Sequence, residues 1–575
     1  MCDVLTTSEI DHILQNSSED DDIDGFMTDC SGEQIEHNHI SDDSELEVND
    51  ESDLEICDDA EFVLGKDGET IWCLSDILAP SKTRRTNIVK KIPGPKPRAR
   101  NVNNEIDAFL SMISLEMIDE ILNCTNKHIV SISHKFARER DCLQSNRPEI
   151  MALFGVLYLI GTRKSGHANV RELWAKDGTG IPIIRAAMNY KRFLFLLNCM
   201  RFDDKTTRDD RKKFDKLAPI RCVVDLFVKN CIDNYSTSEF VTIDEMLHRF
   251  RGRCSFVQYI PNKPAKYGLK MFALCDAKTF YCHNFEVYCG KQPQGPYETS
   301  NSAIDVVKRL VRPIENTNKN ITTDNWYTSV PLADYLLSKR LTLIGTLKKN
   351  KAAIPPSFLP NKAKDVGTSM YGFQDDKTLV SYATKKNKGV VLLSTMHHTK
   401  VIDNETGKPD IIIDYNQTKG GVDTCDKMCA AYSVSRVTRR WPLALFFVFM
   451  NIASINARVI LNFNKNEEPC RRKDFQKRLA MSLMKEHLEM RATIRSLPVD
   501  LTTFLARYRT TDIEEEVAEQ HARKKGTCWM CGRKKNSSTT IKCDTCARFV
   551  CKTHSEKKLI CKHCNQGRSD DNSDE

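Results

Sequence analysis

The chain has 575 residues, of which 40% are hydrophobic, so it is long enough for about three or four domains with substantial cores. Its formal net charge is +7, but residues 1–61 hold 22 of the 78 acidic residues and no Lys or Arg, which leaves the rest of the chain strongly basic. A basic body favours a polyanionic partner. The acidic N-terminus lacks the apolar segment of a secretory signal, and the dense apolar runs, about eleven residues long, fall short of the about 20 that a membrane span needs. We therefore expect neither a secreted nor a membrane protein.

Residues 1–80 are predicted to form an acidic, disordered region, because charge is dense there and aromatic residues are few. Two roles stay open for it: weak autoinhibition, as a DNA mimic folded back on the basic body, or simply improved solubility. Residues 81–104 follow as a basic linker. Over 81–100 it carries eight bases and no acid, and its prolines predict an extended chain. This composition suits nuclear import or phosphate contact, and it is equally compatible with a plain solvated linker.

Helical spacing of apolar residues begins near residue 105, in 106–110 and 117–122. The dense apolar run 151–161 predicts a core helix. These patterns predict a helical domain over 105–265.

Residues 266–349 alternate between strand-like and helical patterns, which predicts an α/β fold around one sheet. The strand-like segments are 269–276, 280–288, 320–324 and 341–347, and the helical segments are 303–310 and 331–339. Residues 350–410 interrupt this alternation, which resumes over 411–454.

Four aspartates stand out in this region. Asp276 and Asp324 each end a strand-like segment, whereas Asp423 and Asp426 start a predicted helix, where their i, i+3 spacing places them on one face. Like charges held together repel unless a cation lies between them, and oxygen ligands favour Mg²⁺ or Mn²⁺. Acids at strand ends that meet a helix-borne acid are the components of a two-metal phosphoryl-transfer site. Taken alone, each acid is more often a turn residue or a solvated helix start.

The C-terminal region carries eight cysteine and histidine residues in four closely spaced pairs. They are Cys528, Cys531, Cys543, Cys546, Cys551, His554, Cys561 and Cys564. Two tetrahedral Zn²⁺ ions need eight such ligands, and a small segment with so little apolar content needs metal to fold. The spacing permits a cross-brace, in which the first and third pairs share one ion and the second and fourth share the other. Sequential pairing also stays open, as does replacement of a neighbouring ligand by His563.

Several sequence blocks resemble the signature blocks of piggyBac-type transposases. They are Gly252-Arg253-Cys254 with Tyr259 to Pro264, Cys275-Asp276, Thr323 to Ser329, Tyr415 to Asp426, and Arg440-Trp441-Pro442. The resemblance is ordered and covers roughly residues 105–564. It implies an RNase H-like DDE recombinase core over 266–349 and 411–454, with a β-rich insertion over 350–410. It also implies that the helical domain serves dimerisation and DNA binding and that it resumes after the core, over 455–510.

The resemblance further implies a cut-and-paste enzyme that nicks transposon ends, forms and opens hairpin ends, and joins them to TTAA target DNA. Asp276, Asp324 and Asp423 are expected to bind two Mg²⁺ or Mn²⁺ ions, and Asp426 to ligate or support a ligand, whereas the family pattern gives Glu245 no catalytic role. The expected partners are double-stranded DNA, carrying terminal inverted repeats or the TTAA target, and a second copy of the chain in a homodimer. The expected location is the nucleus. A host-adopted DNA-binding or chromatin-binding protein that keeps the fold without transposing is the alternative.

Basic and aromatic residues near the expected core are candidates for DNA contact. Lys348, Lys349 and Lys351 follow a strand-like segment and are expected to contact phosphates. Trp441, beside Arg439 and Arg440, is expected to stack on an unpaired base, although a core aromatic at a helix start fits it equally well.

The remaining boundaries place a linker at 511–527, the zinc module at 528–564 and an acidic tail at 565–575. Bases beside the first cysteine pairs favour DNA as the partner of this module, in agreement with the family resemblance.

Overall fold

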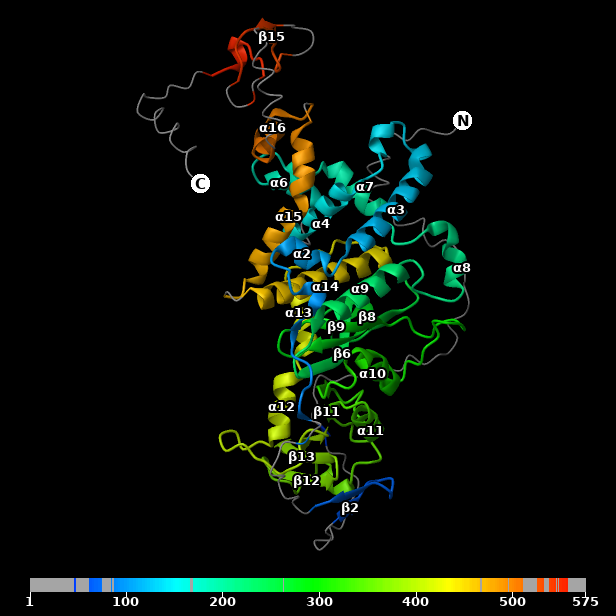
Figure 1. Ribbon diagram of the computed structural model, residues 1–575. Coiled ribbons are helices and arrows are strands. Elements are labelled where there is room, and N and C mark those ends of the chain that lie inside the picture. The colour runs from blue at the N-terminus through cyan, green and yellow to red at the C-terminus, as the bar shows by residue number, and fades with distance from the viewer. Residues whose placement is uncertain are drawn as a thin grey trace, which may run out of the picture. The chain divides into compact units, whose positions relative to one another are not determined.

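The computed structural model (Figure 1) describes residues 46–47, 62–74, 84, 87–165, 169–261, 263–465, 468–494, 496–509, 525–531, 537–543, 546 and 548–556. The chain forms two compact units. The first contains the residues up to 169 together with 190–483, and the second contains 170–189 and the residues from 484 onward. Each unit therefore combines segments that are far apart in the sequence.

A mixed sheet forms the centre of the first unit. Its strands β6 (Phe240–Arg249), β8 (Tyr267–Asp276), β9 (Cys282–Val287), β10 (Asn320–Thr323) and β11 (Thr342–Thr346) lie in the order β9-β8-β6-β10-β11. Strands β6, β10 and β11 run parallel, and β8 runs antiparallel to both of its neighbours. The short strand β7 (Val257–Tyr259) pairs with the start of β8.

The position of β6 corrects the predicted domain boundary. Residues 105–265 were expected to be helical, but the β-branched run Val241-Thr242-Ile243 begins the central strand of the sheet. The helical part therefore ends at α9 (Arg221–Asn234), and the sheet begins at Phe240, 26 residues before the predicted boundary at 266.

One face of the sheet is apolar and covered by α10 (Ala303–Val311) and α11 (Val330–Ser338), which lie on the same side in Figure 1. Alternate strand residues point to opposite faces, so Val241 and Ile243 of β6 and Ile321 of β10 pack into this core. Ser302 and Ser329 accept hydrogen bonds at the starts of the two helices.

The opposite face carries small polar residues and receives α12 (Asp410–Thr418) and α13 (Gly421–Ala431). The hydroxyl of Thr242 donates to the Thr418 carbonyl at 2.6 Å, and that of Thr322 donates to the Thr418 hydroxyl at 2.8 Å. A Cβ on Gly421 would lie only 2.5 Å from the Thr242 hydroxyl oxygen. Glycine at this turn therefore allows α13 to approach β6 closely.

Residues 350–410 are β-rich, as expected. Strands β12 (Ser369–Gln374), β13 (Lys377–Lys385) and β14 (Lys388–Ser394) form an antiparallel meander, and β14 pairs with β11. The insertion is therefore continuous with the central sheet. The two-residue strand β1 (Leu46–Glu47) also pairs with β14.

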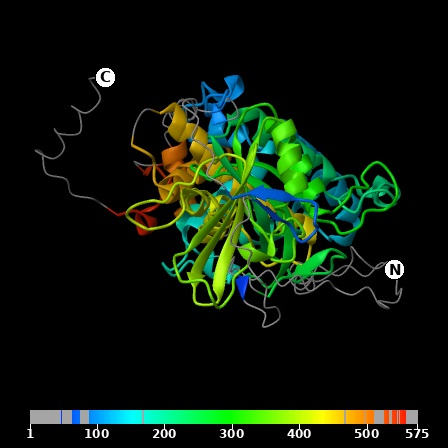
Figure 2. The ribbon, with the colours of Figure 1, turned by 90° about the horizontal axis from the view of Figure 1, so that it is seen from below.

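An N-terminal hairpin extends this sheet, which corrects the expectation that all of residues 1–80 are disordered. Strands β2 (Phe62–Leu64) and β3 (Ile71–Cys73) pair with each other, and Cys73 pairs with Phe373 of β12. Figure 2 shows the blue hairpin beside the yellow-green strands of the insertion. Trp72 is fully buried there, and its indole nitrogen donates to the Ala353 carbonyl at 2.9 Å.

Trp72→Ala is expected to destabilise the attachment of this hairpin by about 3–5 kcal/mol, the usual cost of truncating a buried Trp. Phe62→Ala is the matched control, because Phe62 lies on the same hairpin but is 56% exposed. Limited proteolysis of residues 62–74 measures the difference. Equal protection in the two variants would contradict the anchoring role of Trp72.

The described part of the basic linker is only partly extended, because Pro97–Ala99 form a 3₁₀ turn after a short strand. Strand β4 (Gly94–Pro95) pairs with β5 (Tyr235–Ser236). Gly94 has φ +128°, and a Cβ there would meet the ring of Phe463 at 2.7 Å, so glycine is required. The Lys96 ammonium donates to the Ile232 carbonyl at 2.7 Å.

Helices complete the first unit. They are α2 (Glu105–Leu110), α3 (Leu115–Ile132), α4 (Arg147–Thr162), α7 (Tyr190–Cys199), α8 (Arg208–Lys212), α9 and α14 (Trp441–Asn464). By length and composition α14 could cross a membrane, but 89% of its apolar window is buried by the rest of the protein, as in the core helix of a globular domain.

The second unit contains α5 (Val170–Leu173), α6 (Pro182–Ala187) and α16 (Val499–Leu505), and α15 (Arg472–Ala492) belongs partly to each unit. Arg185 of α6 contacts Asp500 of α16 at 2.6 Å. Strands β15 (Gly526–Thr527) and β16 (Ser538–Thr539) form a small hairpin in the cysteine-rich segment. Short 3₁₀ turns occur at Pro97–Ala99, Ser133–Lys135, Glu139–Asp141, Lys205–Thr207, Arg312–Ile314, Pro356–Phe358, Ala506–Tyr508 and Lys552–His554.

Candidate functional site

An acidic cleft opens where β6 and β10 end. The parallel register pairs Ile243 with Thr323, so the next residues, Asp244 and Asp324, lie side by side at the same end of the sheet. The strand alternation places them on the face covered by α13, whose first turn carries Asp423. All three aspartates line one cleft of about 280 Å³.

Burial raises the pKa of two of these carboxylates, those of Asp244 and Asp324. It raises the pKa of Asp324 to about 7, with a further rise from Glu245 and an opposing effect of the Trp326 and Tyr327 backbone N–H groups. The pKa of Asp244 lies well above its usual range, first because of burial and then because of Glu245, Asp324 and Asp423. A cation between these groups would relieve the repulsion, and a set of carboxylate oxygens fits Mg²⁺ or Mn²⁺.

The raised pKa of Asp324 predicts that the metal-free protein loses stability as the pH rises. The folded state retains a proton on Asp324 that the unfolded state, with an ordinary pKa near 3.8, has already released. The stability contributed by this group is therefore full below about pH 4 and falls by about 4 kcal/mol in total as the pH rises to about 7. Thermal unfolding of the wild type and of Asp324→Asn between pH 5 and pH 8 measures this, and an equally steep loss in both proteins would contradict it.

A lysine already lies among the acids of the cleft. Lys263, in the turn between β7 and β8, places its ammonium 3.0 Å from Asp423. Burial alone would lower the pKa of Lys263, but Asp244 and Asp423 outweigh burial and raise it.

The structure does not bring Asp276 to this cleft, and this expectation is corrected. Asp276 pairs across the sheet with Val241, whereas Asp244 pairs with Ala273, because β8 runs antiparallel to β6. Asp276 thus lies at the start of β6, about 10 Å along the strand from Asp244. Its buried carboxylate accepts hydrogen bonds from the Ser238 backbone and hydroxyl, at 2.6 and 2.7 Å, and from two further backbone N–H groups in its own turn. These contacts give it a turn-stabilising role.

Asp426 and Glu245 lie near the cleft but face other partners. The Asp426 carboxylate is 3.7 Å from the His248 ring, and burial raises the pKa of Asp426. Glu245 contacts the Lys270 ammonium at 3.2 Å and accepts a hydrogen bond from the Tyr327 hydroxyl at 3.1 Å. A supporting position for Asp426 and a structural position for Glu245 agree with these contacts.

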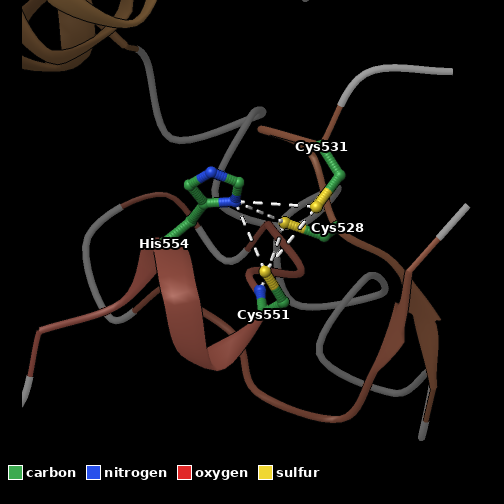
Figure 3. Close-up of side chains that lie close together, drawn as sticks. All are labelled: Cys528, Cys531, Cys551 and His554. Carbon is green, nitrogen blue, oxygen red and sulfur yellow. Dashed lines mark hydrogen bonds between the residues drawn. The ribbon is translucent and has the colours of Figure 1, made fainter. Parts of the chain in front are cut away.

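The cysteine-rich segment brings four predicted ligands together (Figure 3). Nδ1 of His554 and the sulfurs of Cys528, Cys531 and Cys551 all lie within 4.8 Å of one another. The Cys531 and Cys551 sulfurs are 3.7 Å apart, and the Cys528 sulfur is 3.6 Å from the His554 nitrogen. The edge of a tetrahedron with metal–sulfur bonds of about 2.3 Å is about 3.8 Å, so the four atoms fit a tetrahedral ion.

The arrangement corresponds to the cross-brace rather than to sequential pairing, because the first and third pairs meet. Burial raises the pKa of Cys528, but the Cys551 backbone N–H, which donates to its sulfur at 3.2 Å, and the His554 ring lower it to about 6. The thiolate is the form that binds a metal. Of the second predicted group, Cys543 and Cys546 are described, and Cys561, His563 and Cys564 lie outside the described residues.

Comparisons with known proteins agree with this architecture. A family model described as Transposase IS4 matches residues 104–458. A solved piggyBac transposase, in a synaptic complex with hairpin DNA, is 36% identical to the chain with a TM-score of 0.72, covering 82% of this chain and 100% of that one. The chain belongs to the piggyBac-type transposase family.

Human relatives are more distant. PiggyBac transposable element-derived protein 3 and the chimeric ERCC6-PGBD3 protein are each 23% identical to this piggyBac-type chain over 397 residues. The match spans 65% of this chain and of the first relative, and 36% of the second.

Asp244 lines the cleft of this piggyBac-type chain but was not among the predicted site residues. Its signal was present, because Val241-Thr242-Ile243-Asp244 has the same pattern as Ile321-Thr322-Thr323-Asp324, namely a β-branched run that ends in an acid. The two segments lie in register as parallel neighbours. This similarity conflicts with the prediction that residues up to 265 are helical.

The residues predicted to contact DNA divide into two groups: lysines in the turn after β11, and Arg440, whose guanidinium binds protein carbonyls. The Lys348 charge lowers the pKa of Asp324, which places this lysine near the cleft, and Lys349 and Lys351 follow it in the same turn. By contrast, Arg440 donates to the carbonyls of Leu197, Asn198 and Met200 at the end of α7.

Trp441 takes the alternative role of a core aromatic at a helix start. Its side chain is 9% exposed and meets the Phe256 ring edge-on at 5.1 Å. The expectation that it stacks on a base is therefore corrected, because its ring faces are covered by protein.

Proposed function

We propose that this protein is a cut-and-paste DNA transposase of the DDE type. The observation that carries the proposal is the convergence of Asp244, Asp324 and Asp423, from two parallel strands and a facing helix, on one cleft. Membership of a transposase family and the similarity to a solved piggyBac transposase support DNA as the substrate.

The sheet supports an RNase H-like assignment for the core. Three strands, β9, β8 and β6, follow one another antiparallel, and β10 and β11 then add on the other side of β6 in parallel. This order places the ends of β6 and β10 together, as a carboxylate-based nuclease centre requires.

The chain's own residues position the reaction. Bound among Asp244, Asp324 and Asp423, divalent cations would activate the attacking oxygen and stabilise the leaving oxygen of an in-line displacement at phosphorus. Strands β6 and β10 fix two of the carboxylates on a rigid sheet, and α13 carries the third. The buried surroundings strengthen every electrostatic contact in the cleft.

Repeated use of one such cleft accounts for nicking, hairpin formation, hairpin opening and joining to TTAA target DNA, because each step exchanges one phosphodiester bond. The basic body and Lys348 suit DNA phosphates. We further propose that the protein acts in the nucleus as a homodimer.

The cross-braced cysteine group is proposed to hold structural Zn²⁺, with a second Zn²⁺ at Cys543, Cys546, Cys561 and Cys564. Zinc fits the Cys₃His donor set and the tetrahedral spacing of the first group. Arg548 stacks over the exposed Trp529 at 3.9 Å, which gives this module a basic and aromatic surface suited to DNA.

Excision of a marked donor tests the function. The donor is built from the DNA that flanks the gene, and it is introduced into cells that express the wild type or Asp244→Asn. Excision by the wild type alone, with TTAA restored at the donor, is the expected result. Excision that persists in Asp244→Asn would overturn the active-site assignment.

A second candidate is a DNA-binding protein that does not transpose. The similarity to a human protein described as transposable element-derived favours it. Flanks that carry inverted repeats but are not excised, together with binding to those repeats, would support this candidate.

A further inference from the structure

Lys263 lines the acidic cleft beside Asp423. It belongs to the turn that joins β7 to β8, and its side chain is 15% exposed. Its ammonium is 3.0 Å from a carboxylate oxygen of Asp423 and also interacts with Asp244 across the cleft. A single ammonium thus contacts an acid of α13 and is attracted by an acid of the sheet that lines the same cleft.

A divalent ion held by Asp244 and Asp423 would compete with this ammonium for the Asp423 carboxylate. A lysine ammonium and a Mg²⁺ ion cannot both remain there, because like charges at contact distance repel strongly in a buried site. The lysine stem is flexible, so the ammonium can leave while the turn stays in place.

We propose that Lys263 is a resident counter-ion that occupies the metal position in the free protein and is displaced to a DNA phosphate when metal enters. This inference rests on the proposed function, because it takes the cleft acids as metal ligands. It explains how three clustered acids stay close together without metal. It also makes metal entry and DNA binding favour each other, since DNA supplies the acceptor that the released ammonium needs.

The test measures Mn²⁺ affinity of the full-length protein by electron paramagnetic resonance, without DNA, for the wild type and Lys263→Gln. Removing the competing cation is expected to tighten Mn²⁺ binding by about tenfold or more. Lys427→Gln is the matched control, because Lys427 lines the same cleft one helical turn from Asp423. This control removes the same charge from the cleft and is expected to change the affinity by less than about threefold.

Lys263→Arg keeps the charge and is expected to remain close to the wild type. Mn²⁺ affinity that is unchanged or weaker in Lys263→Gln overturns the inference while leaving the proposed function intact. If neither the wild type nor Lys263→Gln binds Mn²⁺, the inference and the proposed metal site fail together. A circular dichroism spectrum equal to that of the wild type shows that each variant is folded.

A second measurement tests whether the Lys263 ammonium moves to a DNA phosphate. Adding duplex DNA is expected to raise the Mn²⁺ affinity of the wild type more than that of Lys263→Gln, because only the wild type must relocate an ammonium. An equal increase in both proteins would contradict the transfer of Lys263 to DNA.

Discussion

Asp244→Asn is expected to abolish DNA cleavage while leaving the fold intact. The substitution removes one of three carboxylates from the cleft, and loss of a group that stabilises transition-state charge lowers the rate by at least about 100-fold. It also removes a buried charge that Glu245, Asp324 and Asp423 oppose, so the metal-free protein should unfold at an equal or higher temperature. Cleavage of end-containing DNA, Mn²⁺ binding and thermal unfolding are measured together.

Asp276→Asn is the matched control, since it makes the same chemical change on a neighbouring strand. An amide nitrogen cannot accept the hydrogen bonds that the carboxylate of Asp276 receives from Ser238 and its own turn. We expect a loss of about 2–4 kcal/mol in stability, with Mn²⁺ binding of the folded protein retained. Loss of Mn²⁺ binding in Asp276→Asn, with retention in Asp244→Asn, would return Asp276 to the active site.

Cys551→Ser is expected to unfold the cysteine-rich segment and to remove one zinc ion per chain. Cys551 is one of four proposed ligands, with Cys528, Cys531 and His554, and it also orients Cys528 through its backbone N–H. Structural zinc contributes about 10–16 kcal/mol to the folding of small zinc modules, far more than a segment with little apolar content can replace. Zinc content by mass spectrometry and proteolysis within 525–556 report the change.

The exposed Cys222 gives the control for thiol loss, because it lies on α9, outside the cysteine-rich segment. Cys222→Ser should retain all its zinc and the protease resistance of the module. Unchanged zinc content in Cys551→Ser would show that the four side chains do not form one metal site.

The sequence predicted the alternation of strands and helices well, because period-2 and period-3.6 patterns are local properties of the chain. It did not reveal the strand order, which depends on pairing between distant segments. Asp276 and Asp324 both follow strand-like runs, but β8 runs antiparallel to β6. Asp276, the last residue of β8, therefore lies at the opposite end of the sheet from Asp324. Asp244 could have been predicted from the sequence, because the β-branched run before it repeats the pattern that ends in Asp324.

The cysteine spacing predicted eight ligands but left their pairing open, since both cross-braced and sequential sites use the same pairs. The structure selects the cross-brace by placing Cys551 and His554 beside Cys528 and Cys531. The β2–β3 hairpin could not be predicted with the rest of the fold, because two three-residue strands depend on β12 and on burial of Trp72.

Anomalous scattering from Mn²⁺ tests the central claim most directly. Crystals of the full chain grown with duplex DNA and Mn²⁺ should show anomalous density bounded by Asp244, Asp324 and Asp423, with the Lys263 ammonium withdrawn from Asp423. Density beside Asp276, or a fully loaded protein with none between the three cleft acids, would contradict the account of this site.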